Sequence, residues 1–235
     1  RMKILLISAN NERHPYPVAP IGIAYIAKAL QDKGHAVRLT DLCFVEDGCF
    51  SIAKTLHDFN PDVIGISIRN IDNLTYHKSV FYMPEIRRIV DFLKTRTSAP
   101  LVVGGSGFSI FPEEVLRYLG LETGIVGEGE TAFVQLLDVM ENGGSTDHIQ
   151  NLCYIKDGRF NSNGVVYNQF NSKPDRSLLN NGAYLELGGM ANIQSKRGCP
   201  FKCAYCTYPS IEGAMLRLRR PADVAEELKE MRLHY

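Results

Sequence analysis

Residues 3–8, with the sequence KILLIS, set the architecture expected of this chain. An uninterrupted apolar run of this length is typical of a strand that is buried on both faces of a parallel sheet. Pro20 then begins a segment in which apolar residues recur at helical spacing, and Gly34 ends it. The N-terminus therefore predicts a β-α unit whose strand lies near the centre of a sheet.

The same alternation of strand and helix continues through the first 140 residues. Four further apolar runs predict strands at 36–40, 62–68, 100–103 and 124–126, with helices between and after them. We therefore expect an α/β fold, a doubly wound parallel sheet of five strands of the Rossmann or flavodoxin type. In such sheets ligands bind outside the carboxyl ends of the strands, where the glycine-rich loops of this sequence fall.

Composition changes after this domain. Short apolar segments on either side of Asp157-Gly158 predict a β-hairpin, and residues 168–189 are rich in Asn, Ser, Gly, Lys and Pro, as linkers are. A strand over 190–196 and a helix over 221–234, with Val224, Leu228 and Met231 on one stripe, would follow. We expect three parts: a doubly wound domain at 1–145, a hairpin appendage and linker at 146–189, and a further β-α unit at 190–235.

Charge and hydropathy exclude several kinds of partner. The 26 Lys and Arg residues balance the 26 Asp and Glu residues, so no bulk charge favours nucleic acid. No apolar run is long enough to span a membrane, and the N-terminus lacks the features of a signal peptide. We expect a cytoplasmic protein that binds no nucleic acid and has no membrane span.

Three of the six cysteines, Cys199, Cys203 and Cys206, lie within eight residues in a C-x3-C-x2-C pattern. Thiolates are soft ligands that select iron-sulfur clusters, zinc or copper. A structural zinc site normally has four protein ligands, and no fourth Cys or His lies nearby, so the pattern favours a cluster with one open iron. A zinc-stabilised interaction domain remains the alternative.

The cysteine stretch resembles the motif of radical S-adenosylmethionine (SAM) enzymes, C-x3-C-x-aromatic-C, with Tyr205 in the aromatic position. The resemblance implies that Cys199, Cys203 and Cys206 hold a [4Fe-4S] cluster and that SAM chelates the fourth iron and contacts Tyr205. It also implies an electron donor such as flavodoxin or ferredoxin. Cleavage of SAM would generate a deoxyadenosyl radical.

The first domain resembles the cobalamin-binding domain of cobalamin-dependent radical SAM enzymes. The segments that carry this resemblance are 20–27, 61–67, 103–105 and 127–130. It implies that cobalamin binds at the carboxyl edge of the sheet. The residues implied as cofactor contacts are Ser8, Asn10, Pro20, Ser67, Arg69, Asn70, Gly104, Gly105, Ser106, Phe108, Gly127 and Glu128.

One departure from other cobalamin folds concerns the cobalt ligand. Mutases and methionine synthase use a D-x-H-x-x-G motif to supply a histidine, whereas the loop around His14 lacks both the Asp and the Gly. We do not expect His14 to bind cobalt.

The cysteine segment is similar to the first β-α unit of the partial TIM barrel that radical SAM enzymes share, and the chain stops after it. We expect it to be the N-terminal part of a longer enzyme and inactive alone. The enzyme would methylate or rearrange an unactivated carbon of a small-molecule substrate, a lipid or natural product, with most substrate contacts in the rest of the barrel. A non-catalytic module that binds cobalamin or another tetrapyrrole is the alternative.

Overall fold

The computed structural model of the chain describes residues 1–73 and 75–234, and its main element is a seven-stranded sheet in the order β2-β1-β3-β4-β5-β6-β7. The strands are β1 (Lys3–Ser8), β2 (Ala36–Asp41), β3 (Val63–Ser67), β4 (Leu101–Gly104), β5 (Thr123–Ile125), β6 (Leu152–Lys156) and β7 (Arg159–Ser162). The first five are parallel, which confirms the doubly wound α/β domain.

The predicted hairpin is present, but it extends the main sheet instead of forming an appendage. β6 pairs antiparallel with β5, and β7 pairs with β6, so the sheet is two strands wider than the five expected. Asp157 and Gly158 both have positive φ, as a two-residue hairpin turn requires. Leu152 and Cys153 are fully buried, and the pairing covers the otherwise open edge of β5.

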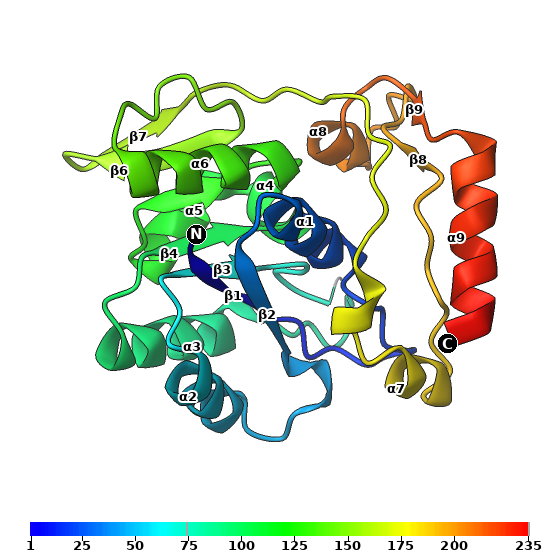
Figure 1. Ribbon diagram of the computed structural model, residues 1–235, viewed down its shortest axis with the longest axis horizontal. Helices are drawn as coiled ribbons and strands as arrows, with labels where there is room; N and C mark the ends of the chain where they lie inside the picture. The colour runs from blue at the N-terminus through cyan, green and yellow to red at the C-terminus, as the bar shows by residue number, and fades with distance from the viewer. Residues whose placement is uncertain (74, 235) are drawn as a thin grey trace.

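Helices cover both faces of the sheet (Figure 1). The helices of this domain are α1 (Ile21–Asp32), the 3-10 turn η1 (Leu42–Phe44), α2 (Gly48–Phe59), α3 (Met83–Arg96), α4 (Ser106–Ile110), α5 (Pro112–Leu119) and α6 (Glu130–Asn142). Successive side chains of β1 point to opposite faces of the sheet. Ile4 and Leu6 pack with α1 and α6, whereas Leu5 and Ile7 pack with α2, α3 and α5. Among the described residues, no helix is long and apolar enough to cross a membrane.

The segment 168–189, whose composition is that of a linker, packs against the first domain. It contains the 3-10 turn η2 (Arg176–Leu178) and α7 (Asn181–Glu186). Tyr184 is buried edge-to-face on Phe44, with ring centroids 4.6 Å apart, and its hydroxyl donates to the Asp41 carboxylate at 2.7 Å. One aromatic side chain therefore attaches this segment to the end of β2.

The C-terminal segment has two short strands of its own. β8 (Lys196–Arg197) and β9 (Arg217–Leu218) form an antiparallel ribbon separate from the main sheet, with α8 (Tyr208–Glu212) between them and α9 (Pro221–His234) after them. The strand predicted over 190–196 is thus wrong except at Lys196. The preceding residues are not in a strand, and Asn192 is held by a hydrogen bond from its side-chain amide to the carbonyl of Ala19.

Helix α9 is present at the predicted residues, but its buried side differs from the predicted stripe. Met231 is buried, whereas Leu228 is 49% exposed and Val224 is partly exposed. Glu227 is buried in their place, at 1% exposure. This helix is therefore held by a charged residue where the apolar pattern predicted a leucine.

Candidate functional site

A cavity of about 330 Å³ opens at the carboxyl edge of the sheet, beside the N-terminus of α1 and the loop between β5 and α6. Ten of the predicted cofactor contacts line it: Ser8, Asn10, Pro20, Ser67, Arg69, Gly104, Gly105, Ser106, Gly127 and Glu128. The sequence pattern thus located the cavity, because loops that follow parallel strands meet at one edge.

Strand register explains why these residues meet. Ser8 at the end of β1 pairs with Ser67 at the end of β3, and Ser67 pairs with Gly104 at the end of β4. The chain leaves β1 toward α1 on one face and leaves β3 toward α3 on the other. A crevice therefore forms between β1 and β3, at the switch point where doubly wound sheets bind ligands.

The neighbouring backbone leaves room only for a glycine at position 105. Its φ is +101°, and a Cβ there would lie 2.5 Å from the carbonyl oxygen of Ile68. Ser109 joins this loop to the next one, since its hydroxyl donates to the Gly105 carbonyl and accepts from the Gly127 N–H, both at 2.8 Å. A lone serine in an apolar helix gave no sequence signal for this role.

Two predicted cofactor contacts lie elsewhere. Phe108 is fully buried in the core, and a Cβ on Gly124 would lie 2.2 Å from its ring. The Phe108 ring therefore supports β5 from beneath and does not line the cavity. Asn70 is likewise not among the residues that line the cavity.

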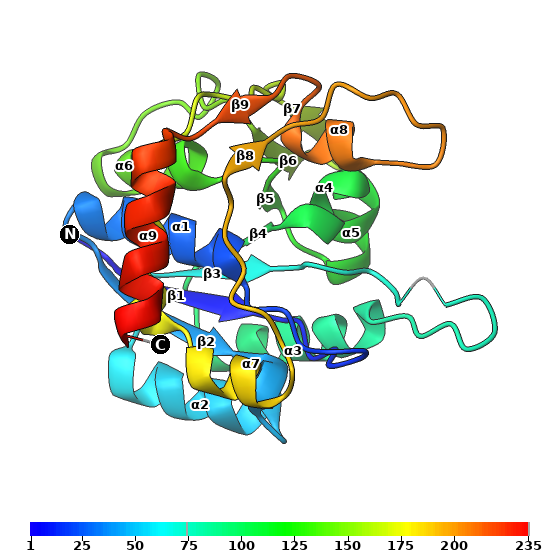
Figure 2. The same ribbon diagram turned by 90° about the vertical axis from the view of Figure 1, so that its right-hand side faces the viewer.

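The cysteine loop extends outward between β8 and α8 (Figure 2). The Cys199 N–H donates to the Gly213 carbonyl at 3.0 Å, and Cys199 is partly buried. Cys203 and Cys206 are exposed, and Tyr205 is 90% exposed. Among the described residues, no group of three or more His, Cys, Asp or Glu side chains is gathered closely enough for a metal ion. The loop supplies three thiols, but it does not hold them together.

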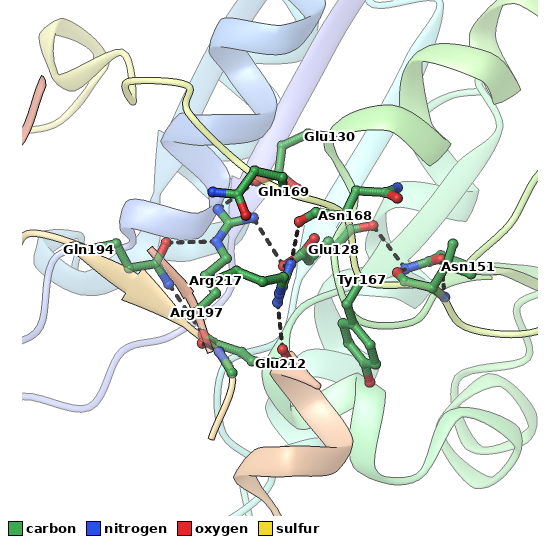
Figure 3. A network of polar contacts seen from close by, with 12 residues as sticks. Glu128, Glu130, Asn151, Tyr167, Asn168, Gln169, Gln194, Arg197, Glu212 and Arg217 are labelled. Carbon is green, nitrogen blue, oxygen red and sulfur yellow. Dashed lines mark hydrogen bonds and ion pairs between the residues drawn. The ribbon is translucent and has the colours of Figure 1, made fainter. Parts of the chain in front are cut away.

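A charged cluster joins the base of this loop to the cavity wall (Figure 3). Arg197 lies 2.6 Å from Glu130 and 3.4 Å from Glu128, and Arg217 lies 2.6 Å from Glu128. We call these four residues the arginine–glutamate cluster. Glu130 and Arg197 also line the cavity, and sequence reasoning missed both because a single charged residue beside a motif carries no pattern.

Burial changes the pKa values of Arg197, which belongs to this cluster, and of Tyr25 beside it. It acts to lower the pKa of Arg197, but Glu130, Glu128 and Tyr25 together outweigh burial and the pKa is raised, so the guanidinium stays charged. Burial raises the pKa of Tyr25 to about 12, against the lowering effect of Arg219. Tyr25 is therefore a neutral phenol that accepts from the Arg219 guanidinium at 3.4 Å.

These features define a class of protein. A mostly parallel sheet, helices on both faces and a glycine-lined cavity at the carboxyl edge belong to the doubly wound domains that bind cofactors. The family model that describes the B12 binding domain matches residues 7–137, more than half of the chain.

Known relatives extend the match over nearly the whole chain. Tryptophan 2-C-methyltransferase of Streptomyces laurentii is 23% identical over 279 residues, which cover 94% of this chain and 46% of that protein. Hopanoid C-3 methylase of Methylococcus capsulatus is 25% identical over 222 residues, which cover 91% of this chain and 40% of that protein. This chain thus spans about half the length of these relatives or less.

A solved structure supports the same relationship. The radical SAM methyltransferase TsrM from Kitasatospora setae, with cobalamin and a [4Fe-4S] cluster bound, superposes with a TM-score of 0.85 at 26% identity, over 97% of this chain and 45% of that one. The chain therefore belongs to the B12-binding domain family, in the branch found in cobalamin-dependent radical SAM enzymes.

Proposed function

We propose that this chain is the cobalamin- and cluster-binding part of a radical SAM methyltransferase that methylates an unactivated carbon of a lipid or natural product. The observation that carries the proposal is the junction of two sites. Arg197 lines the cavity of the B12-type domain, and Cys199, the first of the three motif cysteines, follows two residues later.

Two features of the cavity support a cobalamin there, an open wall and an unpaired buried acceptor. Gly22 lines it, and a Cβ there would meet no atom within 4 Å, so the wall is open at this point. The side-chain oxygen of Asn192, another lining residue, is buried without a hydrogen-bond partner among the described residues. Buried acceptors normally have a donor, and the amide side chains of a corrin would supply one. The hydroxyls of Ser8 and Ser67 offer further polar contacts.

The position of His14 supports a cobalamin whose cobalt has no histidine ligand from this loop. Its side chain is 96% exposed and lies 3.3 Å from the Glu12 carboxylate. It is not among the residues that line the cavity. In the proposed function His14 is a surface residue.

The cysteine loop fits a cluster by its donor chemistry. Cys199, Cys203 and Cys206 would hold three irons, leaving the fourth iron for SAM, with Tyr205 beside it. When bound, the reduced cluster supplies the electron that cleaves SAM, and cobalamin supplies the methyl group. The exposure of Cys203 and Cys206 suits access by SAM and by a protein electron donor such as flavodoxin or ferredoxin.

The domain division supports this assignment of roles. We propose that residues 1–145 hold cobalamin, that 146–189 complete the sheet of that domain with β6 and β7 and then connect, and that 190–235 begin the radical SAM barrel. The names of the relatives describe methylation of carbon 2 of tryptophan and carbon 3 of a hopanoid, one a small metabolite and the other a lipid. They support carbon methylation as the reaction class.

Anaerobic reconstitution tests the proposal. Protein incubated with hydroxocobalamin, iron and sulfide, then desalted, should retain the visible absorbance of cobalamin and bind iron and sulfide in equal amounts. Cobalamin without iron would favour a non-catalytic binding module, and zinc without either chromophore would refute the proposal. In a complete enzyme, SAM cleavage that depends on all three cysteines would support the radical mechanism.

A further inference from the structure

The β8–β9 ribbon places two like charges opposite each other. Arg197 and Arg217 are direct cross-strand partners, and both are buried. Like charges in this arrangement destabilise a strand pair, and each strand has only two residues, so the ribbon cannot be stable by itself. The ribbon therefore requires an anion from another part of the molecule.

That anion comes from the wall of the cavity. Glu128 lies 2.6 Å from Arg217 and 3.4 Å from Arg197, and Glu130 lies 2.6 Å from Arg197, so two carboxylates balance two guanidiniums. The Glu128 backbone carbonyl is fixed in turn by the Asn151 side-chain amide at 3.3 Å. The first domain thus supplies the charges that allow the ribbon to form.

The ribbon also fixes where the cysteine loop begins. The Arg197 guanidinium lies over the Phe170 ring at 4.1 Å and over the Tyr25 ring at 5.0 Å, which restricts its direction. The next residue, Gly198, has φ +80°, and a Cβ there would lie 2.0 Å from the Met215 carbonyl oxygen. Cys199 therefore follows a fixed turn whose base is Arg197.

We propose that Glu128 and Glu130 are positioning residues for the cysteine loop, so that a ligand in the cavity orders the loop through the arginine–glutamate cluster. Both carboxylates line the cavity and contact the ribbon, so a ligand that restrains them also restrains Arg197 and Arg217. The inference rests on the proposed function, because cobalamin is taken as the occupant. By linkage, an ordered loop would bind cobalamin more tightly in return.

Hydrogen exchange followed by mass spectrometry tests the coupling in protein that contains no cluster. Exchange in peptides covering 196–219 is compared with and without saturating hydroxocobalamin, and occupancy is checked by absorbance. In the wild type, cobalamin should slow exchange there by roughly 5- to 150-fold, the range typical of coupled sites. In Glu130→Gln and Arg197→Gln the bound cobalamin should no longer slow it, and Arg197→Lys should restore part of the effect.

The control is Arg220→Gln, in the same segment, because Arg220 is exposed and pairs with Asp223 on α9. It should respond to cobalamin as the wild type does. Circular dichroism establishes that each variant is folded, and if Arg197→Gln does not fold, Glu130→Gln decides. Full loop protection in Glu130→Gln, or in a folded Arg197→Gln, would overturn the inference, as would a cobalamin-loaded wild type without protection. A wild type that binds no cobalamin refutes the proposed function itself, and with it this inference.

Discussion

The N-terminal and C-terminal parts of this chain are stabilised by different kinds of interaction. Up to Leu152, the buried residues are mainly the apolar side chains of strands and helices, as in β1, where Ile4 to Ile7 are at most 1% exposed. Beyond residue 190, Met231 is the one buried hydrophobic side chain among the described residues, while Arg197, Arg217, Arg219 and Glu227 are all buried. The first part has a hydrophobic core, and the second is attached by charges.

This difference decides how each part depends on the other. A hydrophobic core is non-directional and tolerates repacking, whereas a buried ion pair fails when one partner is removed, because the other charge is left without compensation. The domain built on the seven-stranded sheet therefore has the means to fold on its own contacts. The cysteine segment depends on carboxylates at fixed positions in its neighbour and in α9.

The largest expected effect is the loss of the cluster in Cys203→Ala. Cys203 is exposed and contributes no core packing, so the variant should fold normally and still bind cobalamin. Loss of one thiolate leaves an iron without its protein ligand, and iron retained after reconstitution and desalting should fall to background.

Cys43→Ala is the control, because Cys43 is buried in the first domain. It should keep its iron even if its stability falls. Equal loss of iron in both variants would show that the ligands are misassigned and that the two parts are not chemically distinct.

Glu227→Ala tests the charge-held part. The Glu227 carboxylate accepts from Arg176 at 2.7 Å and from Arg219 at 2.6 Å. Its removal therefore leaves two buried guanidiniums without this anionic partner. We expect a loss of about 3–5 kcal/mol in the free energy of unfolding of the segment, measured with urea. Exposed Glu226 offers the matched control, and Glu226→Ala should change stability by no more than about 0.5 kcal/mol. Similar values for the two would mean that charge does not hold this segment.

Two glycines at the cavity separate the demands of folding from those of ligand binding. Gly105→Val would put a side chain against the Ile68 backbone at positive φ, and it should cost about 1–3 kcal/mol of stability. Gly22→Val meets no neighbour and has ordinary helical φ, so stability should be preserved while cobalamin affinity falls. Urea unfolding and absorbance titration measure the two quantities. Unchanged affinity in Gly22→Val would place the ligand away from this wall.

The smallest effect is expected for His14→Ala. The exposed imidazole lies outside the cavity lining, so cobalamin affinity and absorbance should remain those of the wild type. Electron paramagnetic resonance of the cob(II)alamin form provides the sensitive measurement. A nitrogen splitting that disappears in His14→Ala would overturn this expectation.

The sequence predicted the apolar part well because strand burial leaves a local pattern. The run at 3–8 and the glycine loops at 104–105 and 127–129 located the sheet and its carboxyl edge. The hairpin around Asp157-Gly158 was also visible, but its pairing with β5 was not, because periodicity does not specify which edge a strand joins.

The charge-held part could not be predicted in the same way. Arg197 and Glu130 are separated by 67 residues, and no local spacing connects them. The family resemblance implied Glu128 as a cofactor contact, but its loop gave no sign that the carboxylate would face two arginines. Contacts between distant charged residues leave no periodic trace, so they appear only once the chain is folded.

The unequal exposure of the cysteines gives the chain an internal chemical label. Burial raises the pKa of the Cys153 thiol to about 12 and also raises that of Cys43, so neither forms the thiolate that reacts with an alkylating reagent at neutral pH. Cys203 and Cys206 are exposed on the loop. Brief treatment with iodoacetamide should modify these two first, and a bound cluster would mask them. Peptide mass mapping could therefore follow the assembly of the cluster in a crude preparation, without any change to the sequence.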